Sequence, residues 1–117
     1  MEFLKENGID IEKSLELLGD METYNEILED FYSELDDKIN NLEEYKNNDD
    51  MENYSILVHA LKGECKYLGF NELADICYLH QLKSEENDIK YITSSFGELV
   101  EEVKRIKNIV ENYKETL

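Results

Sequence analysis

DMENYSILVHALKGECKYLGF, residues 50–70, is the stretch that decides the fold. Apolar residues recur here at every third or fourth position, as they do on the buried face of an amphipathic helix. These residues are Tyr54, Leu57, Val58, Leu61, Cys65 and Leu68. Gly69 follows the last of them, and a glycine at that place commonly ends a helix. The pattern predicts a helix that stops at Gly69, and His59 is missing from its apolar face.

The residues before this helix predict two more helices. Asp10 can cap a short helix over Ile11–Leu18, with Gly19 at its end. Asp20 can cap a long amphipathic helix. Its apolar positions are Tyr24, Ile27, Leu28, Phe31, Leu35, Ile39, Leu42 and Tyr45. The polar cluster at residues 47–50 then suits a short turn and supplies a cap for the next helix.

Two further helices are predicted after Gly69. The first starts at Asn71 and runs to about Lys83, with Leu73, Ile76, Cys77 and Leu82 among its apolar positions. The last spans about Ile89 to Tyr113 and places Ile92, Phe96, Leu99, Val103, Ile106, Val110 and Tyr113 on one face. Four long helices with short connections favour an antiparallel up-and-down four-helix bundle, with the short additional N-terminal helix packed on one end. We therefore expect an all-α fold in a single domain over residues 1–117.

The composition supports a helical chain and restricts its partners. The 117 residues include no proline and only five glycines, which suits long helices. The net charge of −17 repels phosphate backbones and anionic headgroups, so we expect neither nucleic acid nor a membrane as a partner. Because the chain has no signal peptide pattern and no apolar run of spanning length, the expected location is the cytoplasm.

The cysteines and the second histidine give no sign of a metal site. Cys65 and Cys77 are too few and too widely spaced to hold zinc with His59 or His80, so we interpret them as reduced core residues. His80 is expected to be an ordinary solvated side chain. Acidic runs such as residues 34–37 are interpreted as solvated helix faces.

His59 lies in a sector of its helix that the apolar residues leave free. On a helical wheel this sector also holds Glu52, Ser55, Lys62, Gly63 and Lys66. One ring nitrogen of an exposed imidazole can act as a nucleophile when a hydrogen bond holds the other nitrogen. Lys62, one turn away, can offset the charge of a phosphoryl group on His59. Gly63 leaves the surface beside the ring open for a docking protein, although a glycine inside a helix costs roughly 1 kcal/mol relative to alanine.

Residues 59–70, HALKGECKYLGF, followed by Leu73 and Ala74, resemble the signature of histidine phosphotransfer (HPt) domains. The resemblance extends upstream to the predicted opening helices and implies a four-helix bundle. It also implies that His59 is the phosphoacceptor and Lys62 its charge partner.

Gln81, 22 residues after His59, matches the family position whose side chain hydrogen-bonds the second ring nitrogen. Two residues within the signature affect the charge near His59. Glu64 stands where the family usually has a small serine or alanine, and an acidic group near the site could oppose phosphorylation. It lies about 140° from His59 on the wheel, so we expect it to reach solvent or a basic partner. Lys66, at a position that varies in the family, returns to the His59 face and adds positive charge there.

The resemblance implies a phosphoryl carrier of a two-component phosphorelay. The phosphoryl group would move reversibly between His59 Nε2 and an aspartate of a response-regulator receiver domain, which would provide the Mg²⁺. A histidine kinase or hybrid kinase would be the other partner. Since the chain has no nucleotide-binding glycine-rich loop, we expect a carrier that needs no cofactor of its own and has no kinase activity. Docking would use the sector around His59, with Lys66 and Tyr78 at its rim, and the expected state is a monomer.

Two alternatives stay open. The first is a phosphorylation-silent helical adaptor that binds or sequesters a receiver domain. The second is the phosphoacceptor domain of a larger histidine kinase. Met1 and the completed last helix favour a free-standing protein.

Overall fold

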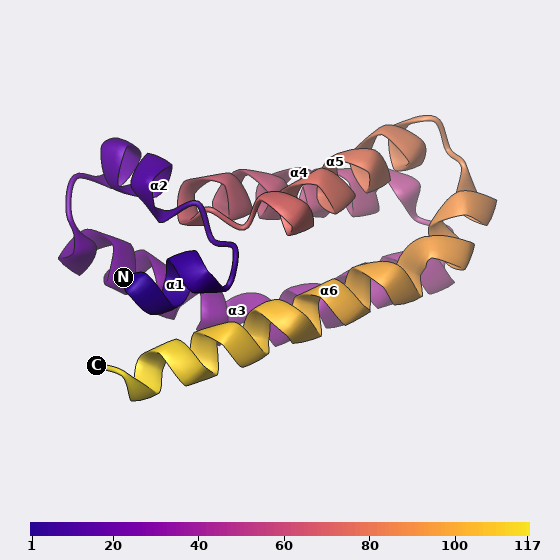
Figure 1. Cartoon of the computed structure of the whole chain (residues 1–117). Helices are drawn as coiled ribbons and strands as arrows, with labels where there is room; N and C mark the ends of the chain where they lie inside the picture. The colour runs from indigo at the N-terminus through magenta and orange to yellow at the C-terminus, as the bar shows by residue number, and fades with distance from the viewer.

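Six α-helices and no strands form the chain in a computed structural model that describes residues 1–117 (Figure 1). The bundle consists of α3 (Met21–Asn47), α4 (Met51–Leu68), α5 (Asn71–Glu85) and α6 (Ile89–Glu115). Each of these helices contacts the next, and α3 also contacts α6, which closes an antiparallel up-and-down bundle. The predicted all-α four-helix bundle is confirmed.

The four helices differ in length, and the N-terminal segment fills the space that results. Helices α3 and α6 have 27 residues each, whereas α4 has 18 and α5 has 15. Two short helices, α1 (Glu2–Glu6) and α2 (Ile11–Leu18), lie at the end of the bundle that holds the C-terminus (Figure 1). Helix α1 contacts α6, and α2 contacts α3 and α4. They cover the part of the long helices that α4 and α5 do not reach.

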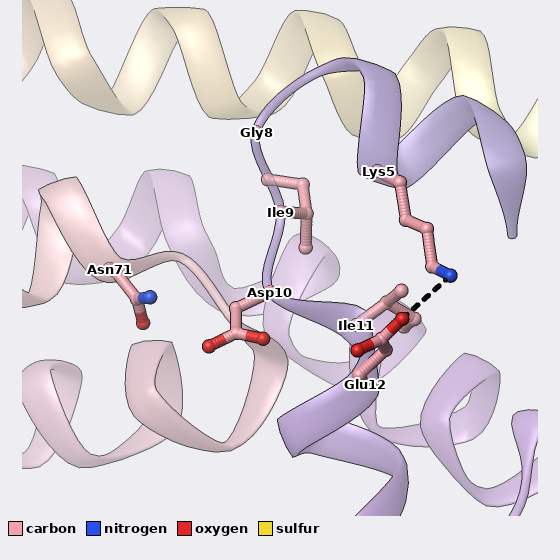
Figure 2. A pocket seen from close by; sticks show the side chains of 7 residues that line it. All are labelled: Lys5, Gly8, Ile9, Asp10, Ile11, Glu12 and Asn71. Atoms are coloured by element: carbon pink, nitrogen blue, oxygen red, sulfur yellow. Dashed lines mark hydrogen bonds and ion pairs between the residues drawn. The ribbon is translucent and has the colours of Figure 1, made fainter.

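Helix α1 is an element that the sequence pattern did not predict. Its Leu4 is fully buried, and the Lys5 ammonium lies 2.9 Å from a Glu12 carboxylate oxygen, which joins α1 to the start of α2 (Figure 2). Gly8 turns the chain between the two helices with a φ of +81°. A five-residue helix with so few apolar residues shows no periodicity, so its stability comes from tertiary packing that the sequence alone does not reveal.

Aspartate side chains begin most of the helices. Asp10, Asp20, Asp50 and Asp88 each accept a hydrogen bond from the backbone N–H three residues later. Such caps satisfy donors that have no partner inside the helix. Helix α5 has no side-chain cap, because Phe70 occupies the capping position and is itself buried.

One apolar core unites the helices. It contains 26 buried residues from Leu4 to Tyr113 and includes the free thiols of Cys65 and Cys77, as predicted. Leu82 was predicted to be an apolar position of α5, but it lies on the surface with 38% of its area exposed. None of the helices is both long and apolar enough to span a lipid bilayer.

The turn from α4 to α5 is bound closely to the N-terminal segment. Gly69 has a left-handed φ of +83°, and its carbonyl accepts a hydrogen bond from the Asp10 N–H at 3.1 Å. A Cβ atom at Gly69 would lie only 2.7 Å from the Asp10 carbonyl oxygen. The buried hydroxyl of Tyr24 donates to the Leu68 carbonyl at 2.7 Å. Gly69 ends α4, and contacts from two other segments hold that end in place.

His80 is buried, so the prediction of a solvated side chain is wrong. Its side chain points between α4 and α6, with Nδ1 2.8 Å from the Tyr54 hydroxyl and the ring against the Tyr91 ring at 5.8 Å. Burial lowers the pKa of His80 to about 4. The Tyr54 hydroxyl provides a hydrogen-bond partner for Nδ1 of the neutral ring, which helps a polar residue to be tolerated in this interface.

We expect the protonation of His80 to destabilise the fold as the pH falls. His80 takes up a proton near pH 6.5 in the unfolded chain but only near pH 4 in the folded chain. The contribution of the neutral His80 to the free energy of unfolding is therefore fully present above pH 6.5 and is lost as the pH falls from 6.5 to 4. Between pH 7 and pH 5 the expected loss is about 1–2 kcal/mol. Urea unfolding at both pH values should show this loss in the wild type and not in His80→Leu.

His59→Gln is the matched control for this measurement, because it removes the exposed histidine and leaves the buried one in place. It should keep the pH dependence of the wild type. Equal pH dependence in the wild type and in His80→Leu would contradict the assignment.

Candidate functional site

His59 lies on the exposed face of α4. Its neighbours Val58 and Leu61 are fully buried, which fixes the rotation of the helix and turns His59 outward. Gln81 projects from the antiparallel helix α5, and its Oε1 lies 2.9 Å from His59 Nδ1. The two residues are 22 positions apart in the chain, and the α4–α5 turn brings them together.

This hydrogen bond assigns different roles to the two ring nitrogens. An amide oxygen only accepts, so in the neutral ring the proton lies on Nδ1 and is donated to Gln81. Nε2 then carries the lone pair, and no protein group hydrogen-bonds to it. The arrangement gives an accessible nitrogen nucleophile with a fixed tautomer.

Lys62 and Gly63 lie on the same side of α4. Lys62 is half-buried, and its ammonium lies 4.9 Å from the centre of the Tyr78 ring on α5. No carboxylate lies within ion-pairing distance of Lys62. A Cβ atom at Gly63 would meet nothing within 4 Å, so the surface beside the histidine is open.

Glu64 has a basic partner on α3. One of its carboxylate oxygens lies 2.7 Å from the Lys38 ammonium, which also lies 3.2 Å from Glu34. Burial alone would lower the pKa of Lys38, but its hydrogen bonds to the two glutamates outweigh burial and raise that pKa. The pairing turns Glu64 toward α3, away from the His59 face. A basic partner or solvent was predicted for Glu64, but Lys38 could not be identified because it lies 26 residues away in the chain.

Two depressions lie along α4, one at His59 itself and one beside Gly63. On one side a shallow hollow is lined by Ser55, Ile56, His59, Gln81 and Glu85. On the other side a groove between α2 and the α4–α5 pair is lined by Lys13, Leu17, Gly63, Lys66, Tyr67, Asn71 and Asp75.

Large apolar side chains are exposed on this surface. About half of the area or more is exposed in each of Ile56, Leu17, Tyr67 and Tyr78. Lys66 and Tyr78 were predicted from the sequence, whereas the contribution of α2 was not, because only the folded chain places α2 beside α4.

The structure shows no group of three or more histidine, cysteine, aspartate or glutamate side chains that could hold a metal ion. The chemistry available at this surface is that of the imidazole, the nearby amide and the lysine ammonium groups.

Comparison with known proteins identifies one related family. The model of a family described as the Hpt domain matches residues 26–109, which include all of α4 and α5 and most of α3 and α6. No curated protein and no solved structure gives a significant match.

Proposed function

Because this chain belongs to the Hpt domain family, whose members carry phosphoryl groups in phosphorelays, we propose that His59 is its phosphoacceptor. The observation that carries the proposal is the position of His59, which is exposed on α4 while Gln81 accepts from its Nδ1–H at 2.9 Å. The other histidine, His80, is buried and has no access to a partner protein.

In the proposed reaction, Nε2 of His59 attacks the phosphorus of an aspartyl phosphate on a receiver domain. The N–P bond forms while the P–O bond to the aspartate breaks, and the carboxylate leaves with the electron pair. The ring becomes positively charged, and the Gln81 oxygen stabilises it through the Nδ1–H. The Lys62 ammonium offsets the charge of the phosphoryl oxygens, while Mg²⁺ belongs to the receiver. The same steps in reverse return the group.

The surface around His59 suits a transient complex with a receiver domain. Three lysines, Lys13, Lys62 and Lys66, place positive charge here beside the carboxylates of Asp75 and Glu85, although the chain as a whole has a net charge of −17. Receiver domains carry an acidic metal-binding pocket, so this local charge favours association in one orientation. Ile56, Tyr67 and Tyr78 supply exposed apolar contact, which fits an interface that forms and releases.

One core extends from Leu4 to Tyr113, which supports a single domain over residues 1–117. We assign it no kinase activity of its own, with a histidine kinase or hybrid kinase as the source of phosphoryl groups. The free thiols of Cys65 and Cys77 agree with a cytoplasmic location.

The test is to incubate the wild-type protein with a phosphorylated receiver domain and Mg²⁺. The expected product is a label that is acid-labile and base-stable, as for a phosphohistidine, and that maps to the peptide containing His59 by mass spectrometry at neutral pH. A protein that binds receivers but accepts no label from any of them would instead be an adaptor. A label on another residue would contradict the assignment.

Gln81→Leu should slow phosphorylation of His59 about five- to tenfold, because one hydrogen bond that supports the charged ring is lost. Gln81→Glu keeps an acceptor oxygen and should stay near the wild-type rate. The rates are measured by single-turnover transfer from a phosphorylated receiver. Equal slowing in both variants would indicate a packing effect rather than loss of the acceptor.

A further inference from the structure

We propose that Tyr78 is a positioning residue that holds the Lys62 ammonium beside His59 through its aromatic ring. This inference rests on the proposed phosphoacceptor role of His59. The Lys62 ammonium lies 4.9 Å from the centre of the Tyr78 ring, within the range of a cation–π interaction. Tyr78 is half-exposed, so its role does not follow from core packing.

The contact repeats the geometry of the His59–Gln81 pair one helical turn further along. Lys62 is three residues after His59 on α4, and Tyr78 is three residues before Gln81 on α5. Residues three apart share a helix face, and α4 and α5 run antiparallel. Both pairs therefore bridge the same face of the same two helices. One pair holds the ring of the histidine, and the other holds the ammonium.

A ring has an advantage over a carboxylate as the partner of this lysine. A glutamate would neutralise the ammonium and compete with the oxygens of the phosphoryl group. The face of a tyrosine ring attracts a cation through its quadrupole and carries no net charge. Lys62 is thereby ordered while its charge remains available, and less side-chain freedom has to be lost when the phosphoryl group arrives.

The other lysine–tyrosine contacts in the protein differ in this respect. Lys83 lies over Tyr91 and Lys114 over Tyr32, but each of these lysines also pairs with a carboxylate, that of Glu86 and that of Glu29. Lys62 is the lysine that has a tyrosine ring and no carboxylate. Lys46, near the end of α3, likewise lies over a ring, that of Phe96, without a carboxylate partner, so the contact of Lys62 gains its meaning from its place one turn from His59.

Phosphoramidate, a small phosphoryl donor, tests the role of Tyr78 without any docking protein. His59 Nε2 attacks its phosphorus, the N–P bond to the histidine forms, the P–N bond of the donor breaks, and ammonia leaves. Tyr78→Leu should be labelled about two- to fivefold more slowly than the wild type, as expected for loss of one exposed cation–π contact. Tyr78→Phe keeps the ring and should retain the wild-type rate.

Two controls separate positioning from other effects. In a Lys62→Met background, Tyr78→Leu should cause no further slowing, because the ring then has no ammonium to hold. Tyr32→Leu removes another lysine–tyrosine contact, that with Lys114 between α3 and α6, and should leave the rate unchanged. Wild-type rates in Tyr78→Leu, or an equal slowing with and without Lys62, would overturn the proposal.

A measurement on the unphosphorylated protein distinguishes this proposal from the proposed function. The NMR signals of the Lys62 side chain should show a ring-current shift that Tyr78→Leu removes and Tyr78→Phe retains. If the shift behaves in this way but the wild type accepts no phosphoryl group, the phosphoacceptor role fails, and with it the part of the inference that concerns catalysis. If Tyr78→Leu leaves the shift unchanged, the positioning role is overturned whatever the phosphorylation result.

Discussion

Replacing His59 with glutamine is expected to abolish phosphoryl transfer from a receiver domain, a loss of at least about a thousandfold, as for removal of a nucleophile in covalent catalysis. The glutamine amide has no lone pair that attacks phosphorus at neutral pH. The fold should remain intact, because His59 is exposed and its side chain makes one hydrogen bond, to Gln81. Transfer is measured by phosphate-affinity electrophoresis after incubation with the phosphorylated receiver.

Receiver binding provides the control for His59→Gln. The docking surface around the site keeps its lysines and apolar side chains in this variant, so the affinity for a receiver should change little. His80→Leu is the matched histidine substitution: above pH 7 it should still accept a phosphoryl group on His59. A persistent label in His59→Gln would mean that the phosphoacceptor lies elsewhere.

Gly69→Ala is expected to destabilise the protein by about 2–4 kcal/mol, with a fall in Tm of about 10–20 °C. Two causes add. The left-handed φ of +83° is unfavourable for a residue with a Cβ atom, and that atom would lie 2.7 Å from the Asp10 carbonyl oxygen. Because the obstructing atoms belong to the backbone of Asp10, the N-terminal segment would have to move to relieve the clash. Thermal unfolding followed by circular dichroism measures the effect.

Gly8→Ala separates these two causes. Gly8 has nearly the same φ, +81°, and the same pattern of backbone hydrogen bonds after its helix, but nothing lies within 4 Å of an added Cβ atom. It should therefore lose only the strain contribution, about 1 kcal/mol. If both variants lose the same stability, the close approach between Gly69 and Asp10 contributes nothing.

Regular helices and a local signature could be predicted from the sequence. The apolar spacing and the aspartate caps placed α3, α4 and α6 within a few residues of their ends. Gln81 was placed opposite His59 from its position relative to the signature, and the structure has these side chains 2.9 Å apart. Both placements depend on patterns within one helix or on a match to a family.

Contacts between distant segments could not be predicted in the same way. Nothing in the sequence around His80 distinguishes it from a solvated histidine. It is a core residue because Tyr54 and Tyr91 pack around it in the folded chain. The Lys38–Glu64 pair joins α3 to α4 and has no local signal. Helix α1 has too few apolar positions to show a period.

The turn after α4 has a consequence for how the protein can be divided experimentally. The donors to the carbonyls of Leu68 and Gly69 are the Tyr24 hydroxyl and the Asp10 backbone N–H. Both come from residues that precede position 26, where the family match begins. A fragment cut at that boundary would retain His59 and Gln81 but would lose the groups that anchor the far end of their helix pair. The minimal unit for expression, crystallisation or grafting into another signalling protein therefore includes the N-terminal helices.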